Sequence, residues 1–388
     1  MPKIHVADLP WVEQHSPTRK FHSFCRNLSL ALGGVRNADT WGGGHPFDLQ
    51  IRRLPPGAAV CPFHAHLAQW ELFVVLAGTG TVRAGRETHP VAPGEVFVHP
   101  PGEPHQLINS GSADLEVLII ADNPPLDAFY YPDSHKWGLR PPGKYFRMAE
   151  TGYFDGEEPA VDGAPPYQPS GSPAAPALSP FTTRKLHPDS LQWEIYDSPG
   201  KKFVGYSKEI STALGAKRLT PTGLGGHPFD LEMQKLPPGK SGCPFHLHAA
   251  QWELYYILSG TATARINADT QTLRPGDVLL HPPGEAHQMT NASATEDLIL
   301  YVVADNPLVD YWQYPDSGKW GVREPRKSFR MTETDYWDGE ECMAAASHRR
   351  NFDSPAARRL HAPPHLTRHP PPAAAADGAA APAAVVGR

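Results

Sequence analysis

Two short stretches of this chain contain residues whose types and spacing could bind a metal ion. CPFHAHLAQWE (residues 61–71) and CPFHLHAAQWE (residues 243–253) each contain a His-x-His pair followed by a glutamate. Residues i and i+2 of a strand project from the same face, so His64 and His66 can converge on one ion, and the same holds in the second stretch. One such pair is more often a chance surface pair than a ligand pair, but a repeated pair favours metal binding.

The remaining ligands come from the glutamate and a distant histidine. Glu71 lies an odd number of residues beyond His66, so it reaches the same face only if a turn or bulge intervenes. His105 lies 39 residues after His66, and His287 lies 39 residues after His248. Imidazole and carboxylate suit iron, manganese, nickel, cobalt, copper or zinc, whereas the lack of thiolates argues against a structural zinc site. The spacing predicts one divalent transition-metal ion per stretch, with the ligands His64, His66, Glu71 and His105 in the first and His246, His248, Glu253 and His287 in the second.

Both stretches belong to a larger internal duplication. A constant offset of 182 residues leads from 64 to 246, from 71 to 253 and from 105 to 287, and it becomes 183 further on. The segments between and after the copies are rich in proline and alanine and too poor in large apolar residues to fold alone. We therefore expect an N-terminal domain (1–158), a linker (159–184), a C-terminal domain (185–341) and a disordered tail (342–388).

Within each copy the sequence pattern is typical of β-strands. FDLQIRRL, WELFVVLAG, GEVFVHP and LEVLIIAD are short runs of β-branched, aliphatic and aromatic residues bounded by turn residues. Such strands at regular spacing predict an all-β sandwich or barrel. The region from Pro124 to Trp137 and its copy are expected to be irregular or to contain one short helix.

Both copies resemble the two sequence motifs of the cupin superfamily. Residues 57–78 follow the first motif, in which glycine, H-x-H, glutamate and glycine succeed one another, and GEVFVHPPGEPHQLIN (residues 94–109) follows the second motif. The resemblance covers about four fifths of the chain and is that of a two-domain bicupin. It implies two tandem cupin barrels of the double-stranded β-helix (jelly-roll) type, with the predicted ligands inside each barrel. It also implies that the barrels pair as an internal pseudo-dimer, and a further homo-oligomer stays open.

The segments HPFDL, AQWE, YPDS and DGEE further resemble cupin proteins of uncharacterised function. The fold is shared by dioxygenases, decarboxylases, isomerases, lyases and binding proteins, so it does not name a reaction. Four protein ligands leave two positions of an octahedral ion open, for a bidentate substrate or for substrate and O₂. We expect a metal-dependent oxidoreductase, an O₂-using dioxygenase with Fe(II) acting on a small oxygenated metabolite. The alternatives are a non-oxidative decarboxylase, lyase or isomerase and a small-molecule-binding cupin without turnover.

Several repeated residues are candidates for the walls of the pocket. Gln69 and Gln251 could orient a substrate oxygen as catalytic residues, or could bond the backbone or face solvent. The neighbouring Trp70 and Trp252 could stack on substrate, although core packing is the more common role of a tryptophan. Other expectations are that the turn glutamates Glu103 and Glu285 are exposed to solvent, and that the cysteines Cys61 and Cys243 face away from the metal unless the chain bends at the prolines that follow them.

Composition excludes some partners and favours others. The 388 residues are 40% hydrophobic and 20% charged, with a net charge of −6 and no basic run, so nucleic acid is not an expected partner. The longest apolar runs have the length of strands, and the N-terminus does not resemble a secretory signal, so neither a membrane nor secretion is expected. Four cysteines in such a long chain do not form a disulfide framework. We expect a cytoplasmic protein with a small-molecule substrate.

Overall fold

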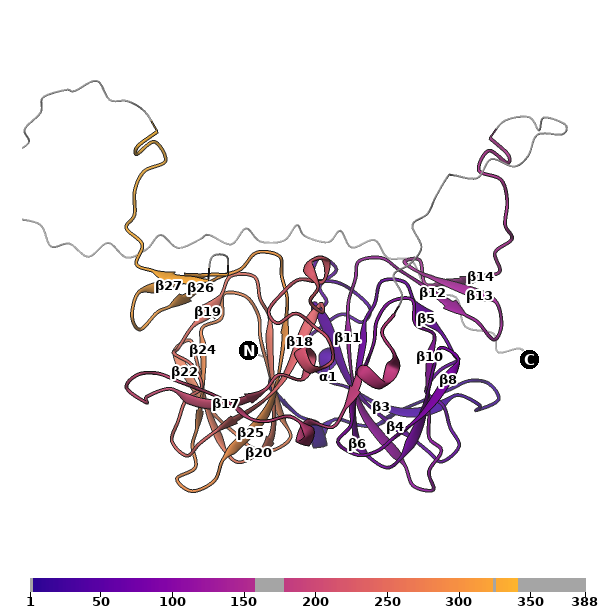
Figure 1. Ribbon diagram of the computed structural model, residues 1–388, viewed down its shortest axis with the longest axis horizontal. Helices are drawn as coiled ribbons and strands as arrows, with labels where there is room; N and C mark the ends of the chain where they lie inside the picture. Colours follow the sequence, from indigo (N-terminus) through magenta and orange to yellow (C-terminus); the bar gives the residue numbers. More distant parts are fainter. Residues whose placement is uncertain (1–2, 158–177, 324–325, 341–388) are drawn as a thin grey trace, which may run out of the picture. The chain divides into compact units, whose positions relative to one another are not determined.

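The computed structural model describes residues 3–157, 178–323 and 326–340. The predicted tail (342–388) and most of the predicted linker (159–184) lie outside these residues. The described residues up to Thr332 form one compact unit, and those from Glu333 onward do not belong to it. The compact unit contains two β-barrels side by side (Figure 1).

The first barrel is built from one large antiparallel sheet and two small ones. The order of the large sheet is β15-β9-β6-β11-β4-β3-β2, and the small sheets have the orders β10-β7-β8 and β14-β13-β12-β5. The strands are β2 (Val12–His15), β3 (His22–Asn27), β4 (Phe47–Leu54), β5 (Ala65–His66), β6 (Glu71–Ala77), β7 (Gly80–Ala84), β8 (Glu87–Val91), β9 (Val96–His99), β10 (His105–Ile108), β11 (Leu115–Asp122), β12 (Asp127–Tyr131), β13 (Lys136–Arg140), β14 (Lys144–Phe146) and β15 (Lys185–Leu186).

The second barrel repeats this plan. Its large sheet has the order β1-β23-β20-β25-β18-β17-β16, and its small sheets have the orders β22-β21-β24 and β19-β26-β27-β28. The strands are β1 (Lys3–His5), β16 (Glu194–Asp197), β17 (Val204–Lys208), β18 (Phe229–Leu236), β19 (Leu247–His248), β20 (Glu253–Ser259), β21 (Ala262–Ile266), β22 (Asp269–Leu273), β23 (Asp277–His281), β24 (His287–Asn291), β25 (Leu298–Asp305), β26 (Tyr311–Tyr314), β27 (Lys319–Val322) and β28 (Lys327–Phe329). The fold is thus all-β with two tandem jelly-roll barrels, as expected.

The helices of the described residues are short. They are α1 (Leu28–Ala31) and α2 (Ile210–Ala213), together with the 3₁₀ turns η1 (Val6–Asp8), η2 (Phe181–Thr183), η3 (Pro188–Ser190) and η4 (Thr222–Leu224). Across the ranges that the structure describes, none of these helices has the length and apolar character needed to span a bilayer.

The expectation for the region from Pro124 to Trp137 was wrong. Instead of an irregular segment or a helix, β12 and β13 form an antiparallel hairpin, and β12 also pairs with β5, the strand that carries His66. The sequence between the strands, PDSH, provides the turn. The hairpin therefore lies directly beside one predicted metal ligand.

The N-terminal arms of the two copies are exchanged between the barrels. β1, near the start of the chain, pairs with β23 of the second barrel, while β15, at the start of the second copy, pairs with β9 of the first. Each arm passes close to a glycine that has a positive φ. If Gly94 had a Cβ atom, that atom would lie 2.2 Å from the His187 ring, and a Cβ atom on Gly276 would lie 2.8 Å from the His5 ring. The close approach of the arms therefore depends on these two glycines.

The large sheets are buried on both faces. In β6, Leu72 and Val74 belong to an apolar cluster shared by both barrels, whereas Phe73 and Val75 belong to the interior of the first barrel. Alternate residues of a strand point to opposite faces, which explains why such strands read as continuous apolar runs like ELFVVLA. The two barrels therefore share one hydrophobic core, and each retains a second core of its own.

Candidate metal centres

Three histidines and a glutamate converge inside the first barrel. The Nε2 atoms of His64 and His66 are 3.0 Å apart, and His105 Nε2 lies 2.6 Å from Glu71 Oε2. One ligand atom each from His64, His66 and Glu71 lie within 4.8 Å of one another. Glu71 reaches the group because residues 67–70 form the irregular connection between β5 and β6 that its odd spacing required. Paired backbone hydrogen bonds between His64 and His105 bring in the fourth side chain.

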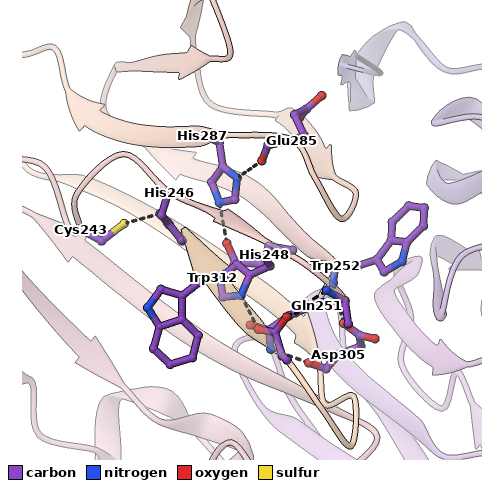
Figure 2. A network of polar contacts seen from close by, with 12 residues as sticks. Cys243, His246, His248, Gln251, Trp252, Glu285, His287, Asp305 and Trp312 are labelled. Carbon is purple, nitrogen blue, oxygen red and sulfur yellow. Dashed lines mark hydrogen bonds and ion pairs between the residues drawn. The ribbon is translucent and has the colours of Figure 1, made fainter. Parts of the chain in front are cut away.

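The second barrel repeats the arrangement. His287 Nε2 lies 2.8 Å from Glu253 Oε2, and His248 Nε2 lies 3.6 Å from Glu253 Oε1. Ligand atoms of His246, Glu253 and His287 lie within 4.8 Å of one another. In Figure 2 the imidazoles of His246, His248 and His287 point toward a common centre. The structure thus brings together all eight side chains that the sequence selected.

The hydrogen bonds of the histidines determine which ring nitrogen faces the centre. In the first barrel, Nδ1 of His64 lies 3.0 Å from the Pro62 carbonyl oxygen and Nδ1 of His105 lies 3.0 Å from that of Glu103. A carbonyl oxygen can only accept a hydrogen bond, so each Nδ1 carries a proton and Nε2 faces the centre, where it can donate to the glutamate or, in a neutral ring, offer a lone pair to a metal ion. His66 differs only in that its Nδ1 contacts the Asp127 carboxylate, at 2.6 Å. Three Nε2 atoms and a carboxylate that face one another in this way could hold a metal ion.

The glutamates have the ionisation state that a ligand needs. Burial by itself raises the pKa of Glu71, but the hydrogen bond to His105 and the neighbouring imidazoles outweigh it and hold that pKa well below its ordinary value. The same causes lower the pKa of Glu253. Both carboxyls are therefore ionised, and the donor set of three imidazoles and one carboxylate fits a borderline divalent metal ion.

Two aspartates orient the histidines, and the sequence reasoning missed both. Asp127 Oδ2 accepts a hydrogen bond from His66 Nδ1, and Asp310 Oδ2 accepts one from His248 Nδ1 at 2.7 Å. Both carboxylates have no exposed side-chain surface. Such an acceptor fixes the tautomer and the orientation of a metal-binding imidazole. An aspartate at the same place in both copies, 183 residues apart, was the available signal.

Behind His105 lies a buried ion pair. The His99 ring stacks on the His105 ring at a centroid distance of 4.1 Å, and its Nδ1 lies 2.6 Å from Glu103 Oε2. Arg184 also donates to both carboxylate oxygens of Glu103. Glu103 is only 6% exposed, so the expectation of solvent exposure was wrong. Its turn is covered by residues 181–184, the end of the segment predicted as a linker.

The second barrel has a partly equivalent arrangement. His281 stacks on His287 with a centroid distance of 4.1 Å, and His281 Nδ1 lies 2.8 Å from Glu285 Oε1. The residue equivalent to Arg184 is Pro2, which lies outside the described residues. Glu285 has 13% of its side-chain surface exposed, so it too is less accessible than expected.

The glutamines and tryptophans before the glutamate ligands have separate environments. Gln69 Nε2 donates to the Asp122 carbonyl oxygen at 2.5 Å, and Gln251 Nε2 donates to that of Asp305 at 2.6 Å, which fits backbone bonding. Both glutamines nevertheless line cavities that contain the ligands, so a catalytic role stays a prediction.

The tryptophans contact the opposite barrel. The Trp70 ring packs 4.6 Å from the His227 ring, and the Trp252 ring packs 5.4 Å from the His45 ring. In Figure 2, Trp252 points away from the three imidazoles. Neither tryptophan lines the cavities that contain the ligands, which fits core packing rather than substrate stacking.

The cysteines lie closer to the ligands than expected. Cys61 Sγ is 3.5 Å from His64 Nδ1, and Cys243 Sγ is 3.6 Å from His246 Nδ1, because the chain is irregular at Pro62 and Pro244. Both thiols line cavities. Burial raises the pKa of Cys61 to about 12, so it is a thiol and not a thiolate ligand.

The cavities around the two centres differ in size and charge. In the first barrel a cavity of about 470 Å³ contains the ligands together with Arg52 and Arg140. In the second barrel the ligands border two cavities, of about 460 and 540 Å³. The larger of these has four cationic side chains, Lys217, Arg218, Arg323 and Arg326, beside the aromatic ring of Trp312.

Comparisons with known proteins agree with this architecture. The cupin domain family model matches residues 50–121 and 232–304, which run from β4 to β11 and from β18 to β25. Auxin-binding protein 1 of Arabidopsis thaliana is 31% identical over 139 residues, 33% of this chain and 63% of that protein. The oxalate-binding protein of Thermotoga maritima is 34% identical over 68 residues, 18% of this chain and 55% of that protein. Both matches span less than two thirds of the relative.

Among solved structures, oxalate decarboxylase from Lactobacillus farciminis in a formate complex covers 79% of this chain and 86% of its own. The identity is 16% and the TM-score 0.47. The family-model match occurs once in each barrel, around the converging histidines and glutamate. Each barrel therefore contains one match to the cupin domain family, and the chain has two tandem cupin domains.

Proposed function

We propose that this bicupin is a metal-dependent enzyme that acts on a small oxygenated carboxylate. The observation that carries the proposal is the convergence of three Nε2 atoms and an ionised glutamate in each barrel, with every Nδ1 hydrogen-bonded to an acceptor. A divalent ion bound there would polarise the oxygen atoms of a substrate and, if it is redox-active, exchange electrons with O₂. The proposed metal ligands are the four residues of each cluster.

A buried arginine nitrogen without a hydrogen-bond partner among the described residues supports an anionic substrate. Arg140 lines the first cavity, and its buried Nη2 has no hydrogen-bond partner in the described part of the chain. It lies 4.0 Å from Asp127 Oδ2, beyond hydrogen-bonding distance. A buried donor without a partner is costly, and a substrate carboxylate would satisfy it with a charge-assisted hydrogen bond. The similarity to the oxalate-binding protein of Thermotoga maritima is consistent with such a ligand.

Two reaction classes fit this substrate. The first is an O₂-using dioxygenase with Fe(II), because the donor set of imidazoles and carboxylate suits that ion. The second is a non-oxidative decarboxylase, lyase or isomerase. Two residues favour this non-oxidative class. Arg140 could bind a substrate carboxylate in the first barrel, and Glu232, which lines the cavity of about 460 Å³ in the second barrel, could supply a proton.

The test is elemental analysis of protein purified without added metal, beside the variants His64→Ala and His246→Ala. We expect two metal equivalents per chain, with one lost in each variant. The purified protein is then tested in an oxygen electrode with hydroxy acids, dicarboxylates, phenols and diketones. Oxygen uptake that matches substrate loss supports the dioxygenase, and turnover without uptake supports non-oxidative chemistry. Binding of an acid without turnover would reduce the proposal to a binding protein, and a metal-free wild type would overturn it.

A further inference from the structure

The cavity of about 460 Å³ in the second barrel contains a carboxyl group at a position where the first barrel has an amide. β4 and β18 are equivalent strands, FDLQIRRL and FDLEMQKL. Gln50 and Arg52 of β4 line the first cavity, and their equivalents Glu232 and Gln234 of β18 line the second. A neutral amide and a cation in one barrel are thus replaced by a carboxyl and a neutral amide in the other.

A second carboxyl, that of Glu209, lies near Glu232, and its negative charge adds to the effect of burial in raising the pKa of Glu232. Two neighbouring carboxyl groups favour a state in which one of them keeps its proton, because two like charges close together repel each other. Glu209 already receives a hydrogen bond from Ser207 Oγ at 2.8 Å and pairs with Arg218 Nη2 at 2.5 Å. These contacts stabilise Glu209 as the ionised partner, which leaves the proton on Glu232.

We propose that Glu232 is the proton donor of the second cupin site, a role that the equivalent residue of the first site, Gln50, cannot fill because an amide does not release a proton. The cavity of about 460 Å³ that Glu232 lines also contains the ligands His246 and Glu253. A substrate bound at the ligands can therefore extend toward Glu232. This role rests on the proposed function, since it needs a ligand at the metal centre.

The surroundings of Glu232 are consistent with this role. Burial raises its pKa to about 8, and the negative charge of Glu209 acts in the same direction. Gln234 Nε2 donates to Glu232 Oε1, and Arg218 lowers the pKa less than these causes raise it. The other titratable or charged groups that face the cavity are Glu194 and Tyr196 from β16, Cys243, Tyr255 from β20 and Arg326. Near neutral pH Glu232 therefore holds its proton.

The chemical step is a simple proton transfer. The carboxyl proton of Glu232 passes to a substrate atom on which negative charge develops, and the Glu232 carboxylate remains. Gln234 and Arg218 are placed to stabilise this carboxylate, and solvent returns the proton before the next turnover. No oxidant or other co-reactant is required.

The first test needs no metal. Infrared spectra of metal-free wild type and Glu232→Gln are recorded at neutral pH, and one spectrum is subtracted from the other. The subtraction removes the carboxyl bands of Asp122 and Asp305, which also contribute because burial raises the pKa values of these two residues to about 7. We expect the difference spectrum to contain a protonated-carboxyl band that shifts in D₂O and disappears when the pH is raised by two units. In the first barrel Arg52 lies beside position 50, and Asn27 occupies the position equivalent to Glu209. The variant Gln50→Glu should therefore add only a carboxylate band. A carboxylate-only difference for Glu232→Gln would overturn the proposal.

The second test uses oxalate as the probe and Mn²⁺ as the metal in the His64→Ala background, where only the second site can load. Affinity for oxalate should fall by about tenfold for each pH unit above the point at which Glu232 ionises. Glu232→Gln should remove this slope, and Glu194→Gln, a matched change in the same cavity, should keep it. An unchanged slope in Glu232→Gln would overturn the donor role. Absence of Mn²⁺ binding would count against the proposed function, whereas the infrared result would still stand.

Discussion

The two barrels keep equivalent ligand sets but surround them with different charges. Around the first centre the strand β4 contributes Gln50 and Arg52, whereas around the second β18 contributes Glu232 and Gln234. In its cavity of about 540 Å³ the second barrel has Lys217 and Arg326, where the equivalent residues of the first barrel are a valine and a glycine. Duplication has thus preserved the residues that a metal needs and changed those that a ligand would meet. We infer that the two sites select different substrates or perform different steps.

The shared core is the region where the barrels should behave alike. Phe47 and Phe229 occupy equivalent positions, are almost fully buried and meet at a centroid distance of 6.1 Å. Either substitution, Phe47→Ala or Phe229→Ala, should lower the free energy of unfolding by about 3–5 kcal/mol, because each leaves a cavity in the same core. Urea denaturation measures this. Clearly unequal losses in the two variants would mean that the barrels do not unfold as one unit.

The buried ion pair should make the first barrel sensitive to a single substitution. Arg184→Met leaves the buried carboxylate of Glu103 without its cation and should cost about 3 kcal/mol at neutral pH. Lys185→Met, which removes a more accessible pair with Glu95, should cost less than about 1 kcal/mol.

The pH dependence of this loss follows from the pKa of Glu103. Burial raises that pKa, but the bonds with His99 and Arg184 lower it to about 2 in the folded protein, against 4.5 ordinarily. A lowered folded pKa means that the carboxylate stabilises the fold fully above pH 4.5 and loses this effect as pH falls toward 2. The difference between wild type and Arg184→Met should therefore shrink below pH 4.5. A difference that is constant down to pH 2.5 would contradict the assignment.

The orienting aspartates should act on their own centres only. Asp127→Asn should weaken metal binding at the first centre by about 10–100-fold, and Asp310→Asn should do the same at the second, because each histidine loses the acceptor that fixes its ring. Metal titrations in the His246→Ala and His64→Ala backgrounds separate the two centres. Asp133→Asn, which removes an exposed pair with Arg83, should leave both affinities unchanged. Loss at both centres from one aspartate would indicate a general folding defect.

The smallest expected effect concerns a hydrogen bond that only the second centre has. Tyr255 donates to Glu253 Oε2 at 2.7 Å, and the equivalent residue in the first barrel is Phe73. Tyr255→Phe should weaken metal binding at the second centre by about 1 kcal/mol, since the ligand loses one orienting bond. Isothermal titration in the His64→Ala background measures the change, and Phe73→Tyr provides the reciprocal variant. An unchanged affinity would show that this hydroxyl is not what distinguishes the two centres.

Much of each centre followed from spacing. His64 and His66 were paired by the two-residue period of a strand, and Glu71 was expected to need a turn, which residues 67–70 provide. His105 was selected only because its distance from His66 is repeated in the second copy. These inferences agree with the positions of the side chains in the structure, because they depend only on strand geometry and on the repeat, and both can be recognised in the sequence.

The errors concern residues whose roles depend on distant parts of the chain. Glu103 was expected to be exposed because it lies in a turn, but Arg184, far along the chain, covers and neutralises it. Asp127 lies in a segment read as irregular because its proline and aspartates resemble a loop. Only its pairing with β5 places its carboxylate against His66. In each case the deciding contact is with a residue more than fifty positions away.

By itself, the sequence determined that two equivalent β-barrels each contain three histidines and a glutamate, because strand periodicity and duplication are properties of local order along the chain. Only the tertiary structure decided that the N-terminal arms β1 and β15 are exchanged. β1 pairs with β23 of the second barrel and β15 with β9 of the first, and each pairing joins segments far apart in the sequence. Only the tertiary structure also decided which polar side chains face each cavity. The charge that a ligand meets is set by residues from many strands, and their convergence depends on how the sheets close around one core.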